Sequence, residues 1–261
     1  MKLSAFITKT DSERRGETFE QCYQMAGQLC DEVVVIDGKD SWPKEFSWEL
    51  IGQHFERGYQ QCTGDWVIHL DTDFIFHEND YATLRQALEA SPTEMALSFW
   101  KYQMYTPDRY ALKSRLVLAV NKGLYGDTIM FDSGPDLCQP SRYGTEIKPH
   151  EVPEARVAFY NYEHILKTKA QITEDVGRMD RAYQRRFGKW LYSEDGTDQS
   201  AYEGWLKMVL GRYRNHGNRL SLEEHPKIMQ DIIKNLRPDQ MGYSIFGNVD
   251  TCSYFQETSH A

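Results

Sequence analysis

The sequence predicts an α/β fold in which a mainly parallel sheet is flanked by helices. The first observation is a β-α-β unit at the start, where short β-prone runs at residues 3–8 and 32–38 enclose a segment with helical spacing of apolar side chains. The second is a largely apolar, β-prone run at residues 66–70, interrupted only by His69 and preceded by an amphipathic helix at residues 46–62. With 261 residues, the chain is long enough to bury a full core without disulfide bonds.

The β-α-β unit sets the direction of its two strands. Its helix spans residues 17–30, and a crossover of that length makes the strands parallel. The loops at residues 8–10 and 37–40 therefore open on the same edge of the sheet. Asp37 either accepts hydrogen bonds from a ribose or a base, or forms a plain Asp-Gly turn. The chain contains no G-x-G-x-x-G or Walker A sequence, which argues against ordinary dinucleotide or P-loop binding.

Two aspartates directly follow the strand at residues 66–70. Asp71 and Asp73 are two positions apart, so they share one face at the carboxyl end of the strand, where open α/β sheets bind their ligands. Adjacent carboxylates repel each other unless a cation lies between them, and hard oxygen ligands suit Mg²⁺ or Mn²⁺, which bridge to substrate phosphates. An Asp-x-Asp sequence also marks ordinary turns. Here apolar residues 74–76 follow, and a surface turn rarely separates two such runs.

The second half of the chain predicts a mixed or antiparallel part of the sheet and then helices. A basic helix at residues 165–187 either exposes a solvated face or uses its first residues to neutralise a diphosphate. We expect an α/β core at residues 1–165 and a C-terminal helical extension at residues 166–261 packed on it. The remaining predicted elements are strands at residues 95–105, 115–120, 128–132 and 157–160, a loop at 133–149, and helices at 79–90, 201–214 and 226–236.

Composition limits the classes of function. The net charge of −9 disfavours broad electrostatic binding of nucleic acid or anionic membranes. The five cysteines are scattered and no secretory signal or long apolar run is present, so we expect reduced thiols, no transmembrane segment and a cytoplasmic location. Aromatic residues make up 13% of the chain, which permits a carbohydrate or nucleoside site.

The order of these pieces resembles the GT-A glycosyltransferases, most closely the family 2 type of bacterial or phage sugar transferase that uses nucleotide-activated sugars. The matching stretches are residues 33–38 (VVVIDG), 55–59 (FERGY) and 63–73 (TGDWVIHLDTD). Residues 149–152 (PHEV) and 162–164 (YEH) look like later landmarks of that branch. This chain has Phe-Ile where the family often has Asp-Glu after the acidic pair, and Arg-Gly where it usually has Arg-Asn.

The resemblance implies a Rossmann-like sheet that binds a nucleotide sugar. It implies that Asp37 contacts the nucleoside, Asp71 the ribose or the metal, and Asp73 the metal on the diphosphate. His164, as a neutral imidazole, is a further candidate metal ligand, although a lone histidine is more often structural. Other residues expected to contact the donor are Thr8, Lys39, Arg57 and Lys167, with Lys169 as a secondary phosphate contact.

The implied reaction is metal-dependent transfer of a sugar from a nucleoside-diphosphate sugar, with UDP and GDP sugars favoured as donors, to an acceptor hydroxyl. Mn²⁺ or Mg²⁺ stabilises the negative charge that builds on the leaving oxygen. The resemblance favours inversion. Glu151 is the candidate general base, and Asp175 and Asp195 are its rivals.

Several alternatives stay open at the level of sequence. The acceptor hydroxyl belongs to a glycan, a lipid-linked sugar or a modified nucleobase, among other options. A non-catalytic nucleotide-sugar-binding module would keep Asp37, Asp71 and Asp73 without needing a base. A metal-dependent phosphoryl or nucleotidyl transferase also uses paired carboxylates at a strand end, but it is expected to carry a phosphate-cradling glycine loop or a third clear acidic partner.

Overall fold

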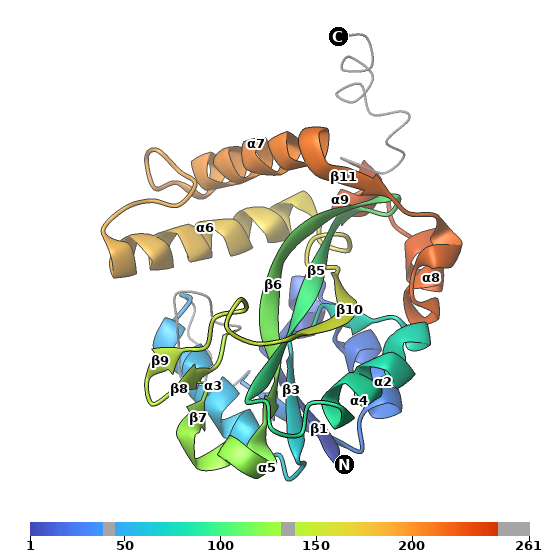
Figure 1. Cartoon of the computed structure of the whole chain (residues 1–261). Coiled ribbons are helices and arrows are strands. Elements are labelled where there is room, and N and C mark those ends of the chain that lie inside the picture. Colours follow the sequence, from blue (N-terminus) through green and yellow to red (C-terminus); the bar gives the residue numbers. More distant parts are fainter. Residues whose placement is uncertain (39–44, 132–138, 245–261) are drawn as a thin grey trace.

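The computed structural model describes residues 1–38, 45–131 and 139–244, and it confirms the predicted α/β class. A curled, mainly parallel sheet forms the centre, and helices pack on both of its faces (Figure 1). Within the described residues the strand order is β2-β1-β3-β6-β5-β10-β4, and β11 pairs with the start of β6. The strands of this sheet are β1 (Leu3–Lys9), β2 (Glu32–Asp37), β3 (Trp66–Leu70), β4 (Phe74–Phe76), β5 (Ala96–Thr106), β6 (Arg109–Asn121), β10 (Glu154–Asn161) and β11 (Gly217–Arg219).

Strands β1, β2 and β3 run parallel, as the β-α-β pattern predicts. Ile7 lies beside both Val35 and Leu70, so the three strands end at one edge of the sheet. Side chains alternate along β1 and divide the core between its two faces. One face packs against α2 (Phe19–Leu29), and the other packs against α3 (Trp48–Gln61).

Helix α3 approaches β1 most closely at Gly58. A Cβ atom at this position would lie 2.7 Å from Cδ2 of the Phe6 ring, well inside van der Waals contact. Phe6 and Phe55 pack in the same core cluster on this side of the sheet. Packing therefore requires glycine at position 58, where the resembling family usually has asparagine.

The other half of the sheet is mixed, as predicted. β5 and β6 form a long antiparallel hairpin, while β10 pairs with β5 in parallel, so β5 and β10 run in the same direction as β1. β6 begins at Arg109, whereas the sequence predicts a start at residue 115. The prediction misses the first half of the strand because that half is only partly buried and lacks a continuous apolar run. Helix α4 (Tyr81–Glu89) follows a short 3₁₀ turn, η1 (Glu78–Asp80), and packs near β10.

A small second sheet replaces part of the predicted loop at residues 133–149. β8 (Ser141–Arg142) pairs with β9 (Thr145–Glu146) and with β7 (Ile129–Met130). Tyr143 and Gly144 join β8 to β9 with φ of 51° and 77°, as a tight hairpin turn needs. Strands of two residues have no periodicity that a sequence can reveal. The other residues of that predicted loop, 133–138, and residue 132 of the predicted strand lie outside the described ranges.

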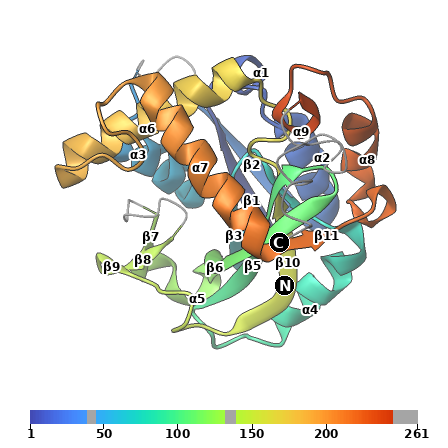
Figure 2. The same ribbon diagram turned by 90° about the horizontal axis from the view of Figure 1, so that it is seen from above.

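Two of the C-terminal helices, α6 and α7, lie across the edge where the parallel strands end (Figures 1 and 2). α6 (Lys169–Phe187) begins later than residue 165 because Thr168 caps it in a reciprocal capping box with Gln171. At Gly177 it meets the start of α7 (Asp198–His216) so closely that a Cβ would overlap the carboxyl group of Asp198. Smaller elements are α1 (Ser12–Arg15), α5 (Lys122–Tyr125), η2 (Gly126–Thr128), η3 (Leu222–Glu224), α8 (Lys227–Lys234) and α9 (Met241–Ser244).

The C-terminal segment is joined to the sheet as well as packed on it. β11 follows α7 directly and pairs with β6, so this segment contributes a strand. The division at residues 165 and 166 remains a prediction. No helix in the described ranges is both long and apolar enough to cross a membrane.

Glu32, at the start of β2, ties three parts of the chain together. Its carboxylate accepts hydrogen bonds from Ser4 Oγ, from the amide N–H of Thr63 at 2.7 Å and from Thr63 Oγ1 at 2.8 Å. Lys2 Nζ lies 3.5 Å from Glu32 Oε1. Burial acts to raise the pKa of Glu32, but these contacts outweigh burial and lower the pKa to about 2.

We expect Glu32→Gln to lower the free energy of unfolding at pH 7 by about 1–3 kcal/mol, because charge-assisted hydrogen bonds are lost. A depressed folded pKa means that the carboxylate stabilises the fold above pH 4.5, and that this stabilisation is lost as the pH falls from 4.5 toward 2. Urea unfolding at pH 7 and pH 3 measures the effect, with exposed Glu89→Gln as the control. A difference between variant and wild type that is the same at both pH values would contradict the assignment.

Candidate active site

A cavity of about 490 Å³ opens where β1 and β3 end. We call it the main cavity. The parallel register brings Thr8, near the end of β1, and Thr10, just after it, beside the residues that follow β3. Helix α3 supplies one wall, and the segment around the start of α6 supplies another. This is the edge at which open α/β sheets bind ligands.

The acidic pair, Asp71 and Asp73, lines the main cavity just after the end of β3. The buried strand β3 ends at Leu70, and the amide of Phe74 donates to the carbonyl of Asp71 at 3.0 Å, which closes a tight turn between the two aspartates. Thr72, inside the turn, donates through Oγ1 to Glu17 at 3.0 Å. The Asp71 side chain is 31% exposed, whereas Asp73 is 8% exposed. The turn therefore presents one accessible carboxyl group and one buried carboxyl group to the cavity.

Among the residues that the structure describes, four carboxyl groups line the main cavity: Glu17, Asp71, Asp73 and Glu163. The pKa of Asp73 is raised well above its usual range, first because the group is buried and then because Glu163 and Asp71 place negative charge nearby; Lys167 acts in the opposite direction. A cation between these groups would relieve the repulsion. The electrostatics at the end of β3 therefore favour a bound positive charge.

The donor set fits Mg²⁺ or Mn²⁺. Within residues 1–38, 45–131 and 139–244, no three His, Cys, Asp or Glu side chains are grouped closely enough to hold a metal by themselves. Asp71 and Asp73 offer carboxylate oxygens, and Mg²⁺ is usually bound by one or two carboxylates together with water and substrate phosphates. The structure is thus consistent with a metal held jointly by the protein and a diphosphate.

Basic side chains face the acidic ones. Lys167 is only 3% exposed and donates to Asp175 Oδ2 at 2.7 Å. Arg15 lies 3.4 Å from Asp175 Oδ1 and 3.0 Å from Glu17 Oε1. Burial acts to raise the pKa of Asp175, but Lys167 and Arg15 outweigh it and hold that pKa below its ordinary value. The predicted phosphate contact Lys167 therefore reaches the main cavity as part of a buried ion-pair network.

The first turns of α3 form an apolar wall. Phe46 and Trp48 precede and begin the helix, with ring centroids 5.0 Å apart, and Ile51 and Phe55 continue the same face. The indole Nε1–H of Trp48 is buried with no hydrogen-bond partner in the described part of the chain. A flat heterocycle stacked here would find both an apolar surface and a donor.

His164 lines a second, smaller cavity of about 180 Å³ that adjoins the main one. Its Nε2 lies 3.3 Å from Glu163 Oε2, and its ring packs edge-on against Trp205. Burial lowers the pKa of His164 to about 4, so the imidazole is neutral at physiological pH. It lines the smaller cavity and not the main one, so the structure does not gather it with Asp71 and Asp73 into one group.

The other predicted donor contacts lie in different places. Thr8 lines the main cavity. Asp37 is exposed at the end of β2, and its carboxylate lies 3.3 Å from Lys9 Nζ. Arg57 is exposed on α3, two residues beyond Phe55 and so on the face of the helix turned away from the cavity. Lys39 lies outside the described residues. Of the three that the structure describes, only Thr8 lines the main cavity together with the acidic pair.

The three candidate bases lie in different parts of the fold. Glu151 is exposed in a turn before the amino end of β10, whose carboxyl end at Asn161 lines the main cavity. Along the paired strand β5 the two ends of β10 are separated by five residues, 98 to 103, or about 17 Å. Glu151 is therefore too far away to act as a base there. Asp195 is exposed in the turn before α7, where it accepts from Thr197, whereas Asp175 lines the smaller cavity.

Sequence reasoning missed four residues of the site. Arg15 lies between the first predicted strand and the helix predicted at residues 17–30, and Glu17 is the first residue of that predicted helix. In the structure α1 ends at its C-cap Gly16, at φ 65°, and both side chains line the main cavity. Glu163 was noted only as part of a motif. Lys101 reaches the cavity from the middle of β5. The one available signal was the dense charge of residues 9–17.

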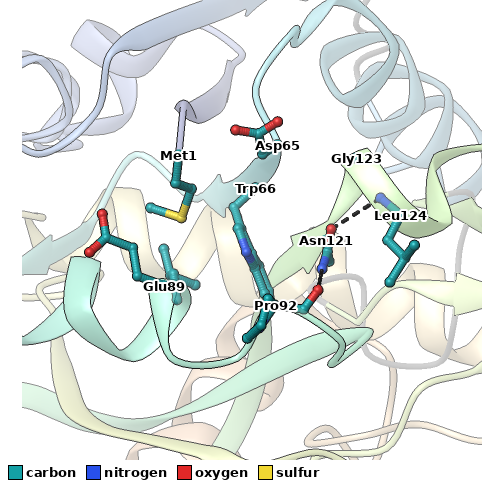
Figure 3. A pocket seen from close by; sticks show the side chains of 9 residues that line it. Met1, Asp65, Trp66, Glu89, Pro92, Asn121, Gly123 and Leu124 are labelled. Atoms are coloured by element: carbon teal, nitrogen blue, oxygen red, sulfur yellow. Dashed lines mark hydrogen bonds between the residues drawn. The ribbon is translucent and has the colours of Figure 1, made fainter.

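A cavity at the opposite edge of the sheet is chemically different. It measures about 370 Å³ and surrounds Trp66, at the start of β3 (Figure 3). One of its polar side chains, Asn121, donates to Pro92 O at 3.0 Å and accepts from Leu124 N at 3.1 Å, which are structural bonds (Figure 3). Asp65 and Glu89 also line this cavity, but the lysine and arginine side chains that line the main cavity do not.

The chain is similar to several solved structures of other proteins. No known family profile and no curated protein matches the chain. A mannosyltransferase from Pyrobaculum calidifontis, solved with GDP-Man and Mn²⁺, is 15% identical over 80% of this chain and 70% of its own, with a TM-score of 0.40. TarS from S. aureus is 11% identical, with 98% and 89% covered and a TM-score of 0.35.

A third similar structure is glucosyl-3-phosphoglycerate synthase from Mycobacterium tuberculosis, solved with Mg²⁺ and UDP. It is 14% identical, with 40% of this chain and 43% of the synthase covered and a TM-score of 0.26. This chain thus matches less than half the length of that synthase. Identities of 11–15% and TM-scores of 0.26–0.40 describe a distant likeness of fold.

We expect Lys167→Ala to lower the free energy of unfolding by about 3–5 kcal/mol, because it leaves the Asp175 carboxylate buried without its main partner. Urea unfolding of Lys167→Ala, Asp175→Ala and the double variant measures the coupling. The double variant should be less destabilised than the sum of the two single variants. Strict additivity would show that the pair makes no net interaction, and exposed Lys169→Ala provides the matched control.

Proposed function

We propose that this protein is a metal-dependent glycosyltransferase that moves a sugar from a nucleoside-diphosphate sugar to an acceptor hydroxyl. The observation that carries the proposal is the acidic pair Asp71 and Asp73 in a cavity that also holds basic side chains and an apolar wall. A nucleoside-diphosphate sugar has a flat base, a diphosphate that binds metal and a polar sugar, and each part has a chemical counterpart in this cavity.

The donor would lie along the main cavity with its base against α3. Trp48 and Phe46 would contact the base, and the unpartnered indole N–H of Trp48 would donate to it. Asp71 and Asp73 would hold Mn²⁺ or Mg²⁺ on the diphosphate. When bound, the metal supplies charge stabilisation for the departing phosphate oxygen.

The basic residues complete the neutralisation of the leaving group. Arg15, Lys101 and Lys167 line the same cavity as the acidic pair. A nucleoside diphosphate leaves with the electron pair of its bond to the anomeric carbon, so its negative charge grows during the reaction. Fixed cations at that point stabilise the transition state more than the bound donor.

The acceptor oxygen forms the new bond to the anomeric carbon and must lose its proton. We assign proton acceptance to Asp175, which is ionised because Lys167 and Arg15 hold its pKa low, and which borders the cavity next to the donor site. Its Oδ1 is less tightly bound than Oδ2, with Arg15 at 3.4 Å against Lys167 at 2.7 Å. Attack from the side opposite to the leaving group would invert the configuration.

Asp73→Asn tests the donor site. We expect it to raise the Kd of UDP or GDP, measured by calorimetry with Mn²⁺, on the order of 10–100-fold, because one metal-binding carboxylate is lost. Asp65→Asn, in the cavity at the opposite edge of the sheet, is the matched control and should bind as wild type does. If the wild type binds no nucleotide in a way that EDTA abolishes, the proposed function fails.

Asp175→Asn tests the proton acceptor and separates an enzyme from a binding module. We expect kcat for sugar transfer or donor hydrolysis to fall about 10²–10⁴-fold while the Kd of the nucleotide with Mn²⁺ stays within a few fold. Glu163→Gln is the comparison, since Glu163 borders both cavities. Near-normal turnover in Asp175→Asn together with a large loss in Glu163→Gln would move the role to Glu163. A wild type without any turnover would support the binding module.

A further inference from the structure

The smaller cavity lies between α6, α7 and the middle of β6. It adjoins the main cavity through shared lining residues, which include Arg15, Glu163 and Tyr192. Asp175, the proposed proton acceptor, borders it, but Asp71 and Asp73 do not. The smaller cavity therefore borders the proton acceptor and does not include the metal-binding pair.

Arg178 on α6 is a buried cation without adequate compensation. The residue is 6% exposed, and its Nε has no hydrogen-bond partner in the described part of the chain. The nearest carboxylate recorded for it is Asp175, whose Oδ1 lies 3.9 Å from Nη1, beyond hydrogen-bond distance. Asp175 is already bonded to Lys167 and ion-paired with Arg15. Burial and the charge of Arg15 both lower the pKa of Arg178.

The rest of the cavity adds to the positive charge. Lys113 on β6 and Arg212 on α7 line it together with Arg15 and Arg178, against two carboxylates, Glu163 and Asp175. A guanidinium whose Nε–H is buried without an acceptor is unfavourable unless an anion supplies one. A planar guanidinium also matches the geometry of phosphate and carboxylate oxygens.

We propose that the smaller cavity binds an anionic group of the acceptor, a phosphate or a carboxylate, with Arg178 as its main contact. This inference rests on the proposed function and specifies its acceptor class. Arg178 lines the smaller cavity only, whereas the groups that would hold the donor's diphosphate line the main one. An anion at Arg178 would set the rest of the acceptor beside Asp175. Trp205 and Tyr192 provide flat surfaces for its carbon skeleton.

Inorganic phosphate is the probe for this subsite. Thermal unfolding is followed in increasing phosphate at constant ionic strength, for wild type, Arg178→Met and the exposed α7 control Lys207→Met. We expect wild type and the control to be stabilised by phosphate, and the apparent phosphate affinity of Arg178→Met to be at least tenfold weaker. Arg212→Met, an exposed residue on the other wall, is the second variant and should also weaken the response. Unchanged phosphate affinity in both variants would overturn the subsite.

A second arm separates the acceptor from the donor. The Kd of UDP or GDP with Mg²⁺ is measured in the same variants, with and without phosphate. Nucleotide binding that is unchanged by Arg178→Met and by phosphate supports an acceptor subsite. Phosphate that competes with nucleotide, with both weakened equally in Arg178→Met, would overturn the acceptor assignment, because the anion would then be the donor's diphosphate. Phosphate binding in a protein that binds no nucleotide would leave the subsite in place while the proposed function fails.

Discussion

The parallel register of β1 with β3 is the constraint on which the site depends. Ile7 and Leu70 lie side by side, so the chain leaves both strands at the same height and the following residues meet in one cavity. The register is maintained at the other end by Gly64, where a Cβ would lie 2.6 Å from Ser4 Oγ and 2.8 Å from the Ser4 amide. A shift of β3 by one residue would turn the side chains of the strand to the opposite faces of the sheet and displace the turn that holds Asp71 and Asp73.

Both cavities concentrate charge that the fold leaves only partly balanced. The main cavity gathers carboxylates around the buried Asp73, and the smaller one buries the guanidinium of Arg178. Each arrangement opposes folding, since a desolvated charge is unfavourable, and each becomes favourable once a ligand of opposite charge is present. Asp175 and Lys167 lie between the two cavities. Their ion pair stabilises the protein, and it also separates the region that favours a bound cation from the region that favours a bound anion.

Much of the fold follows from local pattern. The β-branched run at residues 33–36 and the apolar strand before Asp71 predict the parallel core and the position of the acidic pair, because strand ends in such sheets are ligand sites. Tertiary contacts decide the rest. Arg57 lies on the face of α3 that is turned to solvent. Glu151 lies in the turn before the amino end of β10, and no local sequence pattern reveals that this end is the one far from the cavity. Arg178 looks like one of many basic helix residues, and only the crossing of α7 buries it.

Gly177 carries a consequence for the evolution of this site. It sits one residue from Arg178 at the crossing of α6 and α7, where a Cβ would overlap the carboxyl group of Asp198. The separation of the two helices sets the width of the smaller cavity, which they wall with Val176, Trp205 and Met208. The size of the residue at position 177 thus sets how closely α6 and α7 approach and how wide the smaller cavity is. A descendant with a larger residue here would hold α7 farther out and accept bulkier molecules, while its metal-binding edge stayed as it is.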